Sequence, residues 1–359
     1  MNLYVFNPEH DLALAQDDKN FTAPHAGRLL RSDLGFIPSF WANNGDIVLV
    51  DNIECAHRSF CNCGKYEKQV KFVDSLTVQP LLEEVTRIVP WGWDICITEQ
   101  LRRIGLRNEL LPNNHLLSKY KSLSNRQTSV KVLGDLVRSI NNKSIIGRSC
   151  YVTTLEELQQ QVCNNDLSVI KAPWSGSGRG IRYVKHEMNN HQTNWAKNII
   201  SNQGGIVIEP YYNKVKDFAM EFFVDCREVR YVGLSLFETV HGVYTGSMIA
   251  LEQDKLRLLS SYFSPSLLDI VRNHILKALT DELLCNYFGP VGVDMMVIEN
   301  PFNKNGETHN HLLHPMVEIN LRQTMGHVAL AISKNIGNMH QLMHIAYDGS
   351  HYHLNIVEM

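Results

Sequence analysis

The stretch that most constrains the fold of this chain is residues 169–184, "VIKAPWSGSGRGIRYV". Two short apolar runs flank a loop rich in glycine and serine, and Lys171 stands in the run that enters the loop. Apolar runs bounded in this way are typical of β-strands joined in a hairpin. Glycine lets the backbone approach phosphate oxygens closely and turn its N–H groups toward them. The stretch therefore predicts an anion-binding flap, although an ordinary hairpin turn would have the same composition.

Three known phosphate-binding motifs can be compared with this glycine-rich stretch. The P-loop pattern GxxxxGK[ST] does not occur in the sequence. The dinucleotide fingerprint GxGxxG opens a helix, whereas Gly176, Gly178 and Gly180 lead into another strand-like run. A protein kinase also has a glycine loop between strands, but its HRD and DFG signatures are absent. The remaining interpretation is a flap between two antiparallel strands.

A second group of polar residues lies far along the chain, with Asp294 in "GVDMMV" and with Glu318 and Asn320 in "VEINLR". Residues i and i+2 of a strand point to the same face, so Glu318 and Asn320 can present oxygens to one site. If the two segments pair antiparallel, Asp294 joins them. Two carboxylates and an amide oxygen suit Mg²⁺. By the same alternation Arg322 is expected on that face, and a strand with a solvated polar face is the alternative.

The first hundred residues alternate strand-like and helix-like segments. Strands are expected at "NLYVF", "GDIVLVDN" and "VKFVDSL", and two further helices are expected within residues 79–105, broken at Pro90 and Gly92. This alternation predicts a small parallel α/β domain.

A new unit is predicted to begin near residue 116. Capping boxes are expected at Ser124 with Gln127 and at Thr154 with Glu157. Apolar spacing predicts a long amphipathic helix at about 267–285 and a last helical stretch at about 326–345. The His-rich segment "ETHNHLLHP" is expected to be a polar loop.

Composition excludes several classes of function. The formal net charge of −3 over 359 residues gives no sign of nucleic-acid binding. No apolar run approaches the roughly 18–20 residues that a membrane helix needs, so no membrane partner is expected. The N-terminus lacks the pattern of a signal peptide. These features favour a cytoplasmic protein.

The cysteines allow two interpretations, free thiols or a metal site. Eight cysteines without secretory features are typical of free thiols. Cys55, His57, Cys61 and Cys63 lie close in sequence and have the atoms for zinc, but the spacing is not a paired CxxC design. A reduced segment is the favoured interpretation, and the sequence does not decide whether these residues bind a metal.

Taken in order, these features resemble the ATP-grasp superfamily. The resemblance depends on "VIKAPWSGSGRGI", "VIEPYYNKVKDFAME", "GVDMMV" and "EINLRQTMGH", and it covers about residues 120–330. It implies an α/β and α+β fold: a small Rossmann-like pre-ATP-grasp domain at 1–115 and a two-lobed ATP-grasp domain at 116–359. Within the latter, 116–208 would include the glycine-rich flap and 209–359 the catalytic, metal-binding subdomain.

The resemblance also implies roles for single residues around the phosphates. Lys171 would contact the α- and β-phosphates. Arg126 occupies a place where many relatives have lysine, and it would be a second phosphate contact. The flap would consist of Ser175, Gly176, Ser177, Gly178 and Gly180.

Other roles concern the nucleoside, the metal and the transferred group. Glu209 and Tyr211 would receive adenine, and Asp217 would bind ribose hydroxyls, with Glu221 as a competitor for that role. The implied metal ligands are Asp294, Glu318 and Asn320, and Arg322 would steady the transferred phosphoryl group. The implied cofactors are ATP and Mg²⁺, with Mn²⁺ as an alternative ion.

The chemistry implied by the resemblance is ligation. Most relatives convert a carboxylate into an acyl phosphate, which an amine then attacks, so small-molecule carboxylate and amine partners are expected. Two alternatives stay open: a kinase without ligation and a non-catalytic ATP-binding module. The acceptor could contact Arg230, His241, Tyr244 or Ser247, and His327 is expected in a helix cap or at the surface. Dimers are common among relatives, so a homodimer is one assembly to test.

Overall fold

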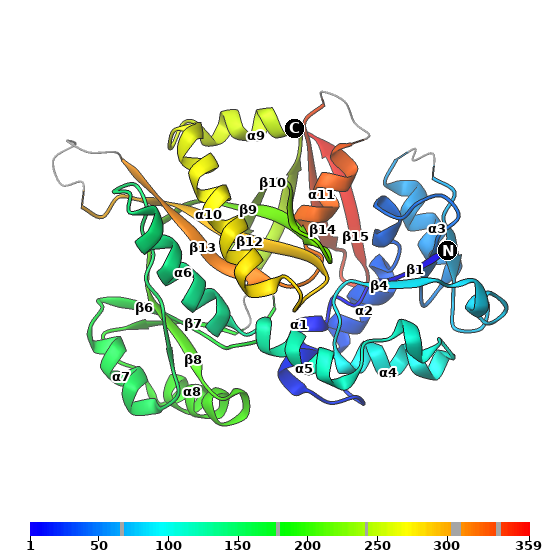
Figure 1. Cartoon of the computed structure of the whole chain (residues 1–359), viewed down its shortest axis with the longest axis horizontal. Helices are drawn as coiled ribbons and strands as arrows, with labels where there is room; N and C mark the ends of the chain where they lie inside the picture. The colour runs from blue at the N-terminus through cyan, green and yellow to red at the C-terminus, as the bar shows by residue number, and fades with distance from the viewer. Residues whose placement is uncertain (65–67, 177–179, 241–242, 303–309, 335–338) are drawn as a thin grey trace. The chain divides into compact units, whose positions relative to one another are not determined.

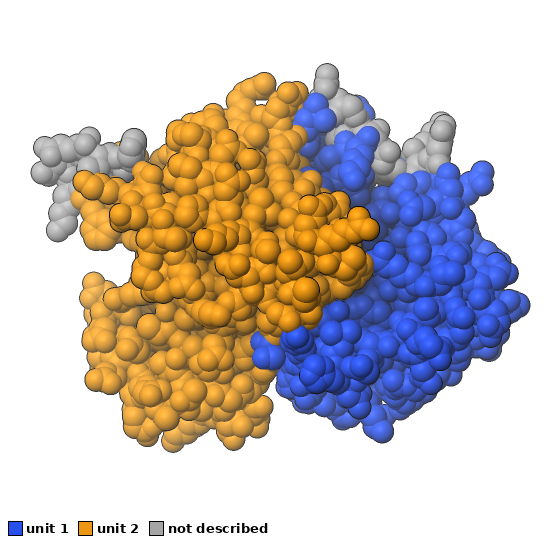
Figure 2. Space-filling view, viewed as in Figure 1, with its two compact units in different colours: residues 1–122, 245–251, 321–359 blue, residues 123–244, 252–320 orange. Residues whose placement is uncertain are grey.

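The structure is a computed structural model that describes residues 1–359 except 65–67, 177–179, 241–242, 303–309 and 335–338. The described residues form two compact units, shown in different colours in Figure 2. Unit 1 consists of Met1–Ser122, Thr245–Leu251 and Leu321–Met359, and unit 2 of Leu123–Tyr244 and Glu252–Asn320. Residues 321–359 thus belong to the unit that holds the N-terminal sheet, whereas the sequence prediction grouped them with residues 116–320. The predicted domain boundaries stay a prediction.

Unit 1 contains a four-stranded sheet in the order β3-β2-β1-β4, in which every neighbouring pair is parallel. Its strands are β1 (Asn2–Val5), β2 (Ile47–Leu49), β3 (Lys71–Val73) and β4 (Arg87–Pro90). The predicted parallel α/β domain is confirmed. The prediction of two helices within residues 79–105 was wrong in part, because Arg87–Pro90 form an edge strand.

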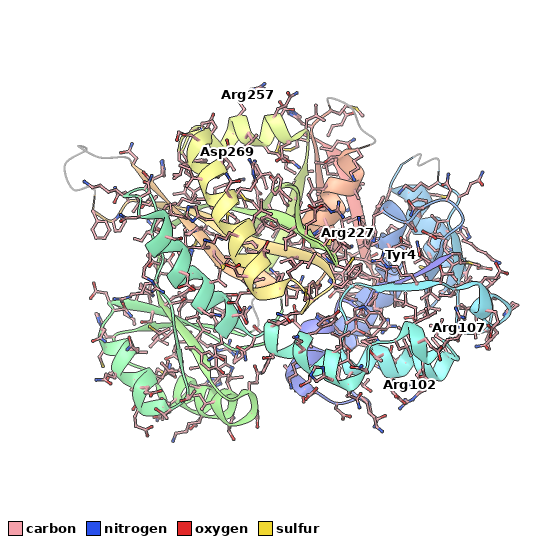
Figure 3. All side chains as sticks on the ribbon, in the orientation of Figure 1. Tyr4, Arg102, Arg107, Arg227, Arg257 and Asp269 are labelled. Carbon is pink, nitrogen blue, oxygen red and sulfur yellow. The ribbon has the colours of Figure 1, made fainter. Side chains whose placement is uncertain are left out.

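Helices and short 3₁₀ turns connect these strands (Figure 1). The helices are α1 (His10–Gln16), α2 (His25–Leu34), α3 (Ile53–Asn62), α4 (Ile95–Ile104) and α5 (Asn114–Leu123), and the turns are Ile37–Phe40, Gln79–Glu84 and Asn108–Leu110. Asp94 caps α4, since its side chain accepts from the N–H of Ile97, and Gly105 ends the helix at φ 103°. Arg102 lies on the exposed side of α4 (Figure 3).

The last part of the chain packs onto one face of this sheet. It contains α11 (Met325–Ser333), β14 (Gln341–Tyr347) and β15 (Tyr352–Glu358). Alternation along β1 places Tyr4 in a core with Val328, Met343 and Leu354, while Leu3 joins a second core with residues of α4. The helix predicted to reach residue 345 ends at Ser333, and Gln341 already begins a strand.

Unit 2 contains a four-stranded sheet in the order β5-β8-β6-β7. Its strands are β5 (Cys150–Val152), β6 (Leu167–Lys171), β7 (Ile181–Lys185) and β8 (Ile206–Pro210), covered by α7 (Leu155–Cys163) and α8 (Asn190–Gln203). Strands β6 and β7 pair antiparallel, with Lys171 opposite Ile181, so the predicted hairpin is confirmed. Helix α6 (Arg126–Ile140) is capped by Asn125 rather than by Ser124.

The second sheet region of unit 2 has the order β13-β12-β9-β10. Its strands are β9 (Lys214–Val224), β10 (Val229–Val240), β12 (Gly289–Glu299) and β13 (His311–Asn320), and the helices are α9 (Glu252–Leu259) and α10 (Pro265–Leu283). The predicted stripe on α10 is confirmed: Leu268, Val271, Ile275, Leu279 and Leu283 are buried. Helix α10 packs against α6 and β10, and Arg257 lies on the exposed side of α9 (Figure 3).

The remaining strand, β11 (Val243–Ile249), begins in unit 2 and ends in unit 1, where Ser247–Ile249 pair with β14. In the described part of the chain, no helix is long and apolar enough to cross a membrane.

Candidate functional site

The proposed metal ligands come together where β12 and β13 pair. The strands pair antiparallel, which was the condition for grouping Asp294 with the other two, and the register places Asp294 directly opposite Glu318. Asn320 lies opposite Gly292, and its Nδ2 donates to Asp294 Oδ2 at 3.1 Å. Side chains of directly opposite residues lie about 5 Å apart at Cβ. Two carboxylates and an amide oxygen thus share one small region, and this set of oxygen donors fits Mg²⁺.

Arg126 connects this region to the entrance of the flap. It is the first residue of α6, its side chain is 7% exposed, and its Nη2 donates to both carboxylate oxygens of Glu318 at 2.8 Å. Its Nη1 donates to the carbonyl of Ala172 and to Ser175 Oγ at 2.5 and 2.8 Å. The neighbouring Ser129 accepts from the N–H of Ile319 at 3.0 Å, which fixes α6 on β13.

Lys171 forms a second buried ion pair. It lies at the end of β6, beside β8, and its Nζ contacts Glu209 Oε1. The two side chains are 6% and 7% exposed, so each charge depends on the other for neutralisation.

One pocket of unit 2 lies between these two pairs. Its empty volume is about 230 Å³, part of it open solvent. It is lined by Arg126, Ser129, Val130, Ser149, Lys171, Val207, Glu209, Met316 and Val317. Both predicted phosphate contacts therefore face a common space inside unit 2.

His314 is a residue of this region that the sequence prediction missed. The segment 311–314 is not a polar loop: it begins β13, and the His314 side chain is fully buried. Burial, and then the nearby Lys171 charge, lower the pKa of His314 to about 3. Simple alternation could not have identified it, because the register of β13 against β12 shifts between His314 and Glu318.

The structure describes the first and last residues of the flap. Ser175, Gly176 and Gly180 are placed, whereas Ser177 and Gly178 lie outside the described residues. A Cβ at Gly180 would lie 2.2 Å from Ser175 Oγ and 2.3 Å from Ser175 Cβ. The carbonyl of Gly180 accepts from the N–H of Ala172 at 2.9 Å, so the loop closes where only glycine fits.

The predicted nucleoside contacts lie around the end of β8. Tyr211 follows Pro210, is 44% exposed, and has its ring centroid 6.0 Å from that of Tyr183. Burial raises the pKa of Tyr183, and the charges of Glu209 and Asp217 add to this effect. Glu209, Tyr211 and Asp217 therefore lie near one tyrosine.

Asp217 and Glu221 share one face of β9. Asp217 accepts from Thr239 Oγ1 at 2.7 Å and also pairs with Lys214. Glu221 is 1% exposed. Ala219, between them, lies opposite Asp294, so both acids are on the sheet face of the predicted metal ligands. The choice between them as the ribose contact stays a prediction.

Arg322 differs from its predicted placement. Strand β13 ends at Asn320, so strand alternation cannot be extended to residue 322. Arg322 belongs to unit 1, where its Nε and Nη2 donate to the carboxylate of Asp11 at 3.1 and 2.9 Å. Its role toward a transferred phosphoryl group stays a prediction.

The candidate acceptor contacts that the structure describes belong to two different units. Arg230 is half-exposed and lies 3.4 Å from Asp225. Tyr244 ends a segment of unit 2, Ser247 is buried in unit 1, and His241 lies outside the described residues. His327 forms a capping box with Thr324 at the start of α11, and this confirms the predicted helix-capping role.

The cysteine-rich segment is mostly helix α3. Cys63 is buried, its Sγ donates to the carbonyl of Ser59, and burial raises the pKa of its thiol to about 12. The His57 ring packs edge-on against Phe72. Among the described residues, no three His, Cys, Asp or Glu side chains converge as a metal site would require.

Comparisons with known proteins give matches only in structure. No family model matches the chain, and no curated protein is significantly similar in sequence. A putative ATP-grasp superfamily protein from Archaeoglobus fulgidus is 12% identical with TM-score 0.50, and the match covers 100% of this chain and 99% of that one. The biotin carboxylase domain of 2-oxoglutarate carboxylase from Hydrogenobacter thermophilus is 12% identical with TM-score 0.51, over 96% and 74% of the two chains.

Biotin carboxylase from Campylobacter jejuni gives a third similarity, with 12% identity, TM-score 0.50 and coverage of 96% and 75%. At 12% sequence identity these three similarities establish the fold alone. The mixed α/β architecture, with a parallel N-terminal sheet and antiparallel sheets, matches these structures. The chain therefore has the ATP-grasp fold, preceded by the α/β domain that accompanies it.

Proposed function

We propose that this chain is an ADP-forming ligase that joins a small-molecule carboxylate to an amine. The observation that carries the proposal is the pocket of unit 2, where Arg126 and Lys171 face a common space and Arg126 reaches Glu318. The Hydrogenobacter domain with the same fold was solved with MgADP, ADP and bicarbonate. A nucleotide polyphosphate is an anion that suits such a pocket.

The two cations would exchange partners when ATP binds. Lys171 and Arg126 are each paired with a carboxylate, and phosphate oxygens can take the place of those carboxylates as partners of the two cations. The planar guanidinium of Arg126 can bind two oxygens at once, as it does with Glu318. We assign Lys171 and Arg126 to the phosphates.

Asp294, Glu318 and Asn320 would hold Mg²⁺, with Mn²⁺ as a substitute. The ion would supply charge neutralisation on the phosphates during phosphoryl transfer. Glu209 and Tyr211 would receive adenine, and Asp217 or Glu221 would bind ribose hydroxyls. Arg322 would steady the transferred phosphoryl group.

The reaction would proceed by in-line attack of the carboxylate on the γ-phosphate, giving ADP and an acyl phosphate. The flap would cover the phosphates and exclude water that hydrolyses the acyl phosphate. The amine then displaces phosphate. The proposed partners are therefore two small molecules, while cytoplasmic location and a homodimer stay predictions.

The test measures release of ADP and inorganic phosphate from Mg²⁺-ATP in the presence of the free proteinogenic amino acids, which are supplied singly and in pairs. Release that requires one acid and one amine together supports a ligase. ADP with a stable phosphorylated product and no free phosphate would replace the proposal with a kinase. Lys171→Ala should abolish release, while Arg138→Gln, at an exposed position of α6, should not change it.

A further inference from the structure

The ion pair of Arg126 and Glu318 joins two side chains of unit 2 that the proposed function assigns to different ligands. Arg126 is assigned to the phosphates and Glu318 to Mg²⁺, yet in the structure they bind each other. Arg126 Nη2 donates to Glu318 Oε1 and to Glu318 Oε2, each at 2.8 Å. The guanidinium therefore contacts both oxygens with which Glu318 would hold a divalent cation.

This pair changes the charge that the proposed metal ligands present. Asp294 lies directly opposite Glu318, and Asn320 is neutral. With Arg126 on Glu318, the two carboxylates and the guanidinium carry a single net negative charge; without Arg126 the carboxylates carry two, which balances a divalent cation. A guanidinium and a metal ion on one carboxylate would repel each other strongly, because the Arg126 side chain is 7% exposed and little water screens its charge. Arg126 thus stands on Glu318 in place of a metal ion.

Arg126 is the fixed partner of the pair. Its Nη1 donates to the carbonyl of Ala172 at 2.5 Å and to Ser175 Oγ at 2.8 Å, and its backbone N–H donates to the carbonyl of Pro173 at 3.2 Å. The Glu318 side chain is 24% exposed and makes no other hydrogen bond to the part of the chain that the structure describes. Rotation of Glu318 therefore breaks the pair, while Arg126 keeps its place at the entrance of the flap.

Arg126 also has a donor that Glu318 does not use. Its Nε atom is buried and has no hydrogen-bond partner among the described residues. An arginine binds an anion best through two N–H groups at once, and Glu318 is reached by Nη2 alone. A phosphate group that accepts from both Nε and Nη2 would satisfy the buried donor as well as the charge. Phosphate is thus the better partner for Arg126.

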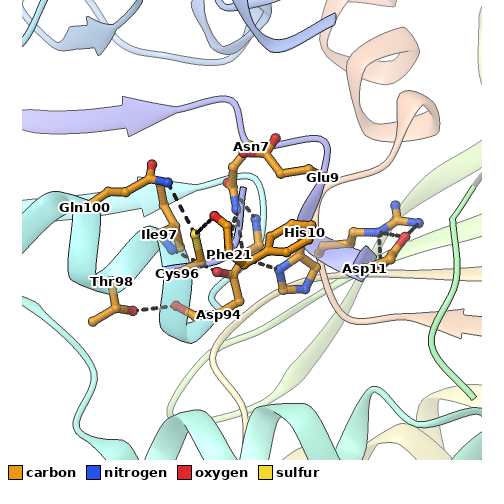
Figure 4. A network of polar contacts seen from close by, with 12 residues as sticks. Asn7, Glu9, His10, Asp11, Phe21, Asp94, Cys96, Ile97, Thr98 and Gln100 are labelled. Atoms are coloured by element: carbon orange, nitrogen blue, oxygen red, sulfur yellow. Dashed lines mark hydrogen bonds and ion pairs between the residues drawn. The ribbon is translucent and has the colours of Figure 1, made fainter. Parts of the chain in front are cut away.

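A buried carboxylate of unit 1 gives the contrast (Figure 4). Asp94 Oδ1 accepts from the N–H of Ile97 at 2.8 Å, while Oδ2 accepts from Asn7 Nδ2 at 3.2 Å and lies 3.0 Å from His10 Nδ1. Because neighbours hold both oxygens and the side chain is 2% exposed, Asp94 is fixed in one place. Glu318 is held by one cation and is partly exposed, as a carboxylate that changes partners must be.

We propose that Arg126 is an internal substitute for the metal ion, so that the chain binds divalent cations weakly until a nucleotide polyphosphate takes Arg126. The inference rests on the proposed function and concerns the regulation of that same site. Phosphate oxygens replace Glu318 on Arg126, and Glu318 becomes available together with Asp294 and Asn320. The coupling is reciprocal, because a cation on Glu318 leaves Arg126 to the phosphates. Couplings of this kind change affinities by about 5–150-fold.

The test measures binding of Mn²⁺ to the full chain without nucleotide, by electron paramagnetic resonance of the unbound ion. Arg126→Gln removes the guanidinium charge, so the dissociation constant for Mn²⁺ should fall by about 5–150-fold. Adding Glu318→Gln to this variant should abolish the gain, because the ion then loses its carboxylate. Arg138→Gln, at an exposed position of the same helix, is the matched control and should leave the dissociation constant unchanged.

Equal Mn²⁺ affinity of Arg126→Gln and the unaltered chain would overturn the inference, and so would a gain that persists with Glu318→Gln. Calorimetric titration of the same preparations with ADP distinguishes this failure from failure of the proposed function. If ADP binds and the Mn²⁺ affinities are equal, this inference alone is wrong. If ADP does not bind to the unaltered chain, the proposed nucleotide site is wrong, and this inference with it.

A second measurement uses the unaltered chain and does not depend on the folding of Arg126→Gln. Nitrogen-15 NMR detects the side-chain Nε–H groups of arginines, and the Arg126 signal is assigned by its absence in Arg126→Lys. Mg²⁺ alone should leave this signal in place, whereas ADP alone should shift it, because phosphate supplies the acceptor that Nε lacks. A shift with Mg²⁺ alone, or no shift with bound ADP, would contradict the inference.

Discussion

Replacing Glu318 by glutamine tests the link between Arg126 and the metal ligands. The glutamine side chain keeps one oxygen acceptor within reach of Arg126 Nη2 but loses the charge. Hydrogen bonds to charged groups contribute about 1.5–3 kcal/mol and neutral ones about 0.5–1.5 kcal/mol. Glu318 is 24% exposed, and Arg126 keeps its bonds to Ala172 and Ser175. The free energy of unfolding should therefore fall by about 1–2 kcal/mol, and the fold should persist.

The effect on ligand binding should be larger than the effect on stability. A ligand at a hundred times its dissociation constant stabilises the folded state by about 2.7 kcal/mol. Urea unfolding with ADP, with and without Mg²⁺, measures how much of this stabilisation depends on the metal. In Glu318→Gln we expect the Mg²⁺-dependent part to disappear, while stabilisation by ADP alone persists. Turnover of ATP should be abolished.

The control is Glu282→Gln. Glu282 is also 24% exposed and pairs with Lys131 of the same helix as Arg126. This change should leave both the Mg²⁺-dependent stabilisation and turnover unaltered. If Glu318→Gln retains full activity, or the same Mg²⁺-dependent stabilisation as the unaltered chain, the assignment of Glu318 as a metal ligand is wrong.

Three further predictions follow from single contacts. Lys171→Met leaves Glu209 buried without its partner, so the free energy of unfolding should fall by about 3–5 kcal/mol and ADP binding should be lost. Calorimetric titration with ADP checks this, and normal binding would refute the phosphate role of Lys171. Gly180→Ala should impair turnover because its Cβ collides with Ser175, and Gly180→Ala with Ser175→Gly should recover it; no recovery would contradict the steric explanation. In the unfolded chain His314 binds a proton below about pH 6.5, whereas its pKa in the folded chain is about 3. The free energy of unfolding should therefore fall as the pH drops from about 6.5 toward 3, by about 2 kcal/mol at pH 5. His314→Leu should remove this loss in acid unfolding curves, and equal acid sensitivity would contradict the assigned burial effect.

Features with a strong local pattern could be predicted from the sequence. The flap hairpin followed from two apolar runs around glycine, and Asp294 could be grouped with Glu318 on the condition of antiparallel pairing, which the structure shows. The apolar stripe of α10 repeats at helical spacing, so its buried face was predictable. In each case the pattern lies within one or two segments.

Features that depend on distant segments could not be predicted in this way. β4 has only four residues, and it becomes a strand because it pairs with β1 more than eighty positions away. Arg322 follows a strand whose last residue no local signal marks, so alternation was extended too far. The His10–Asp94 pair joins residues that no sequence spacing relates.

The central claim is that the carboxylate is activated as an acyl phosphate, and an isotope experiment tests it most directly. The carboxylate that supports ADP release is enriched in oxygen-18, and the inorganic phosphate formed with Mg²⁺-ATP and amine is analysed by mass spectrometry. In-line attack predicts transfer of one carboxylate oxygen, so each phosphate should carry one oxygen-18 atom. Phosphate without the label, or release of AMP and pyrophosphate in place of ADP, would contradict the account.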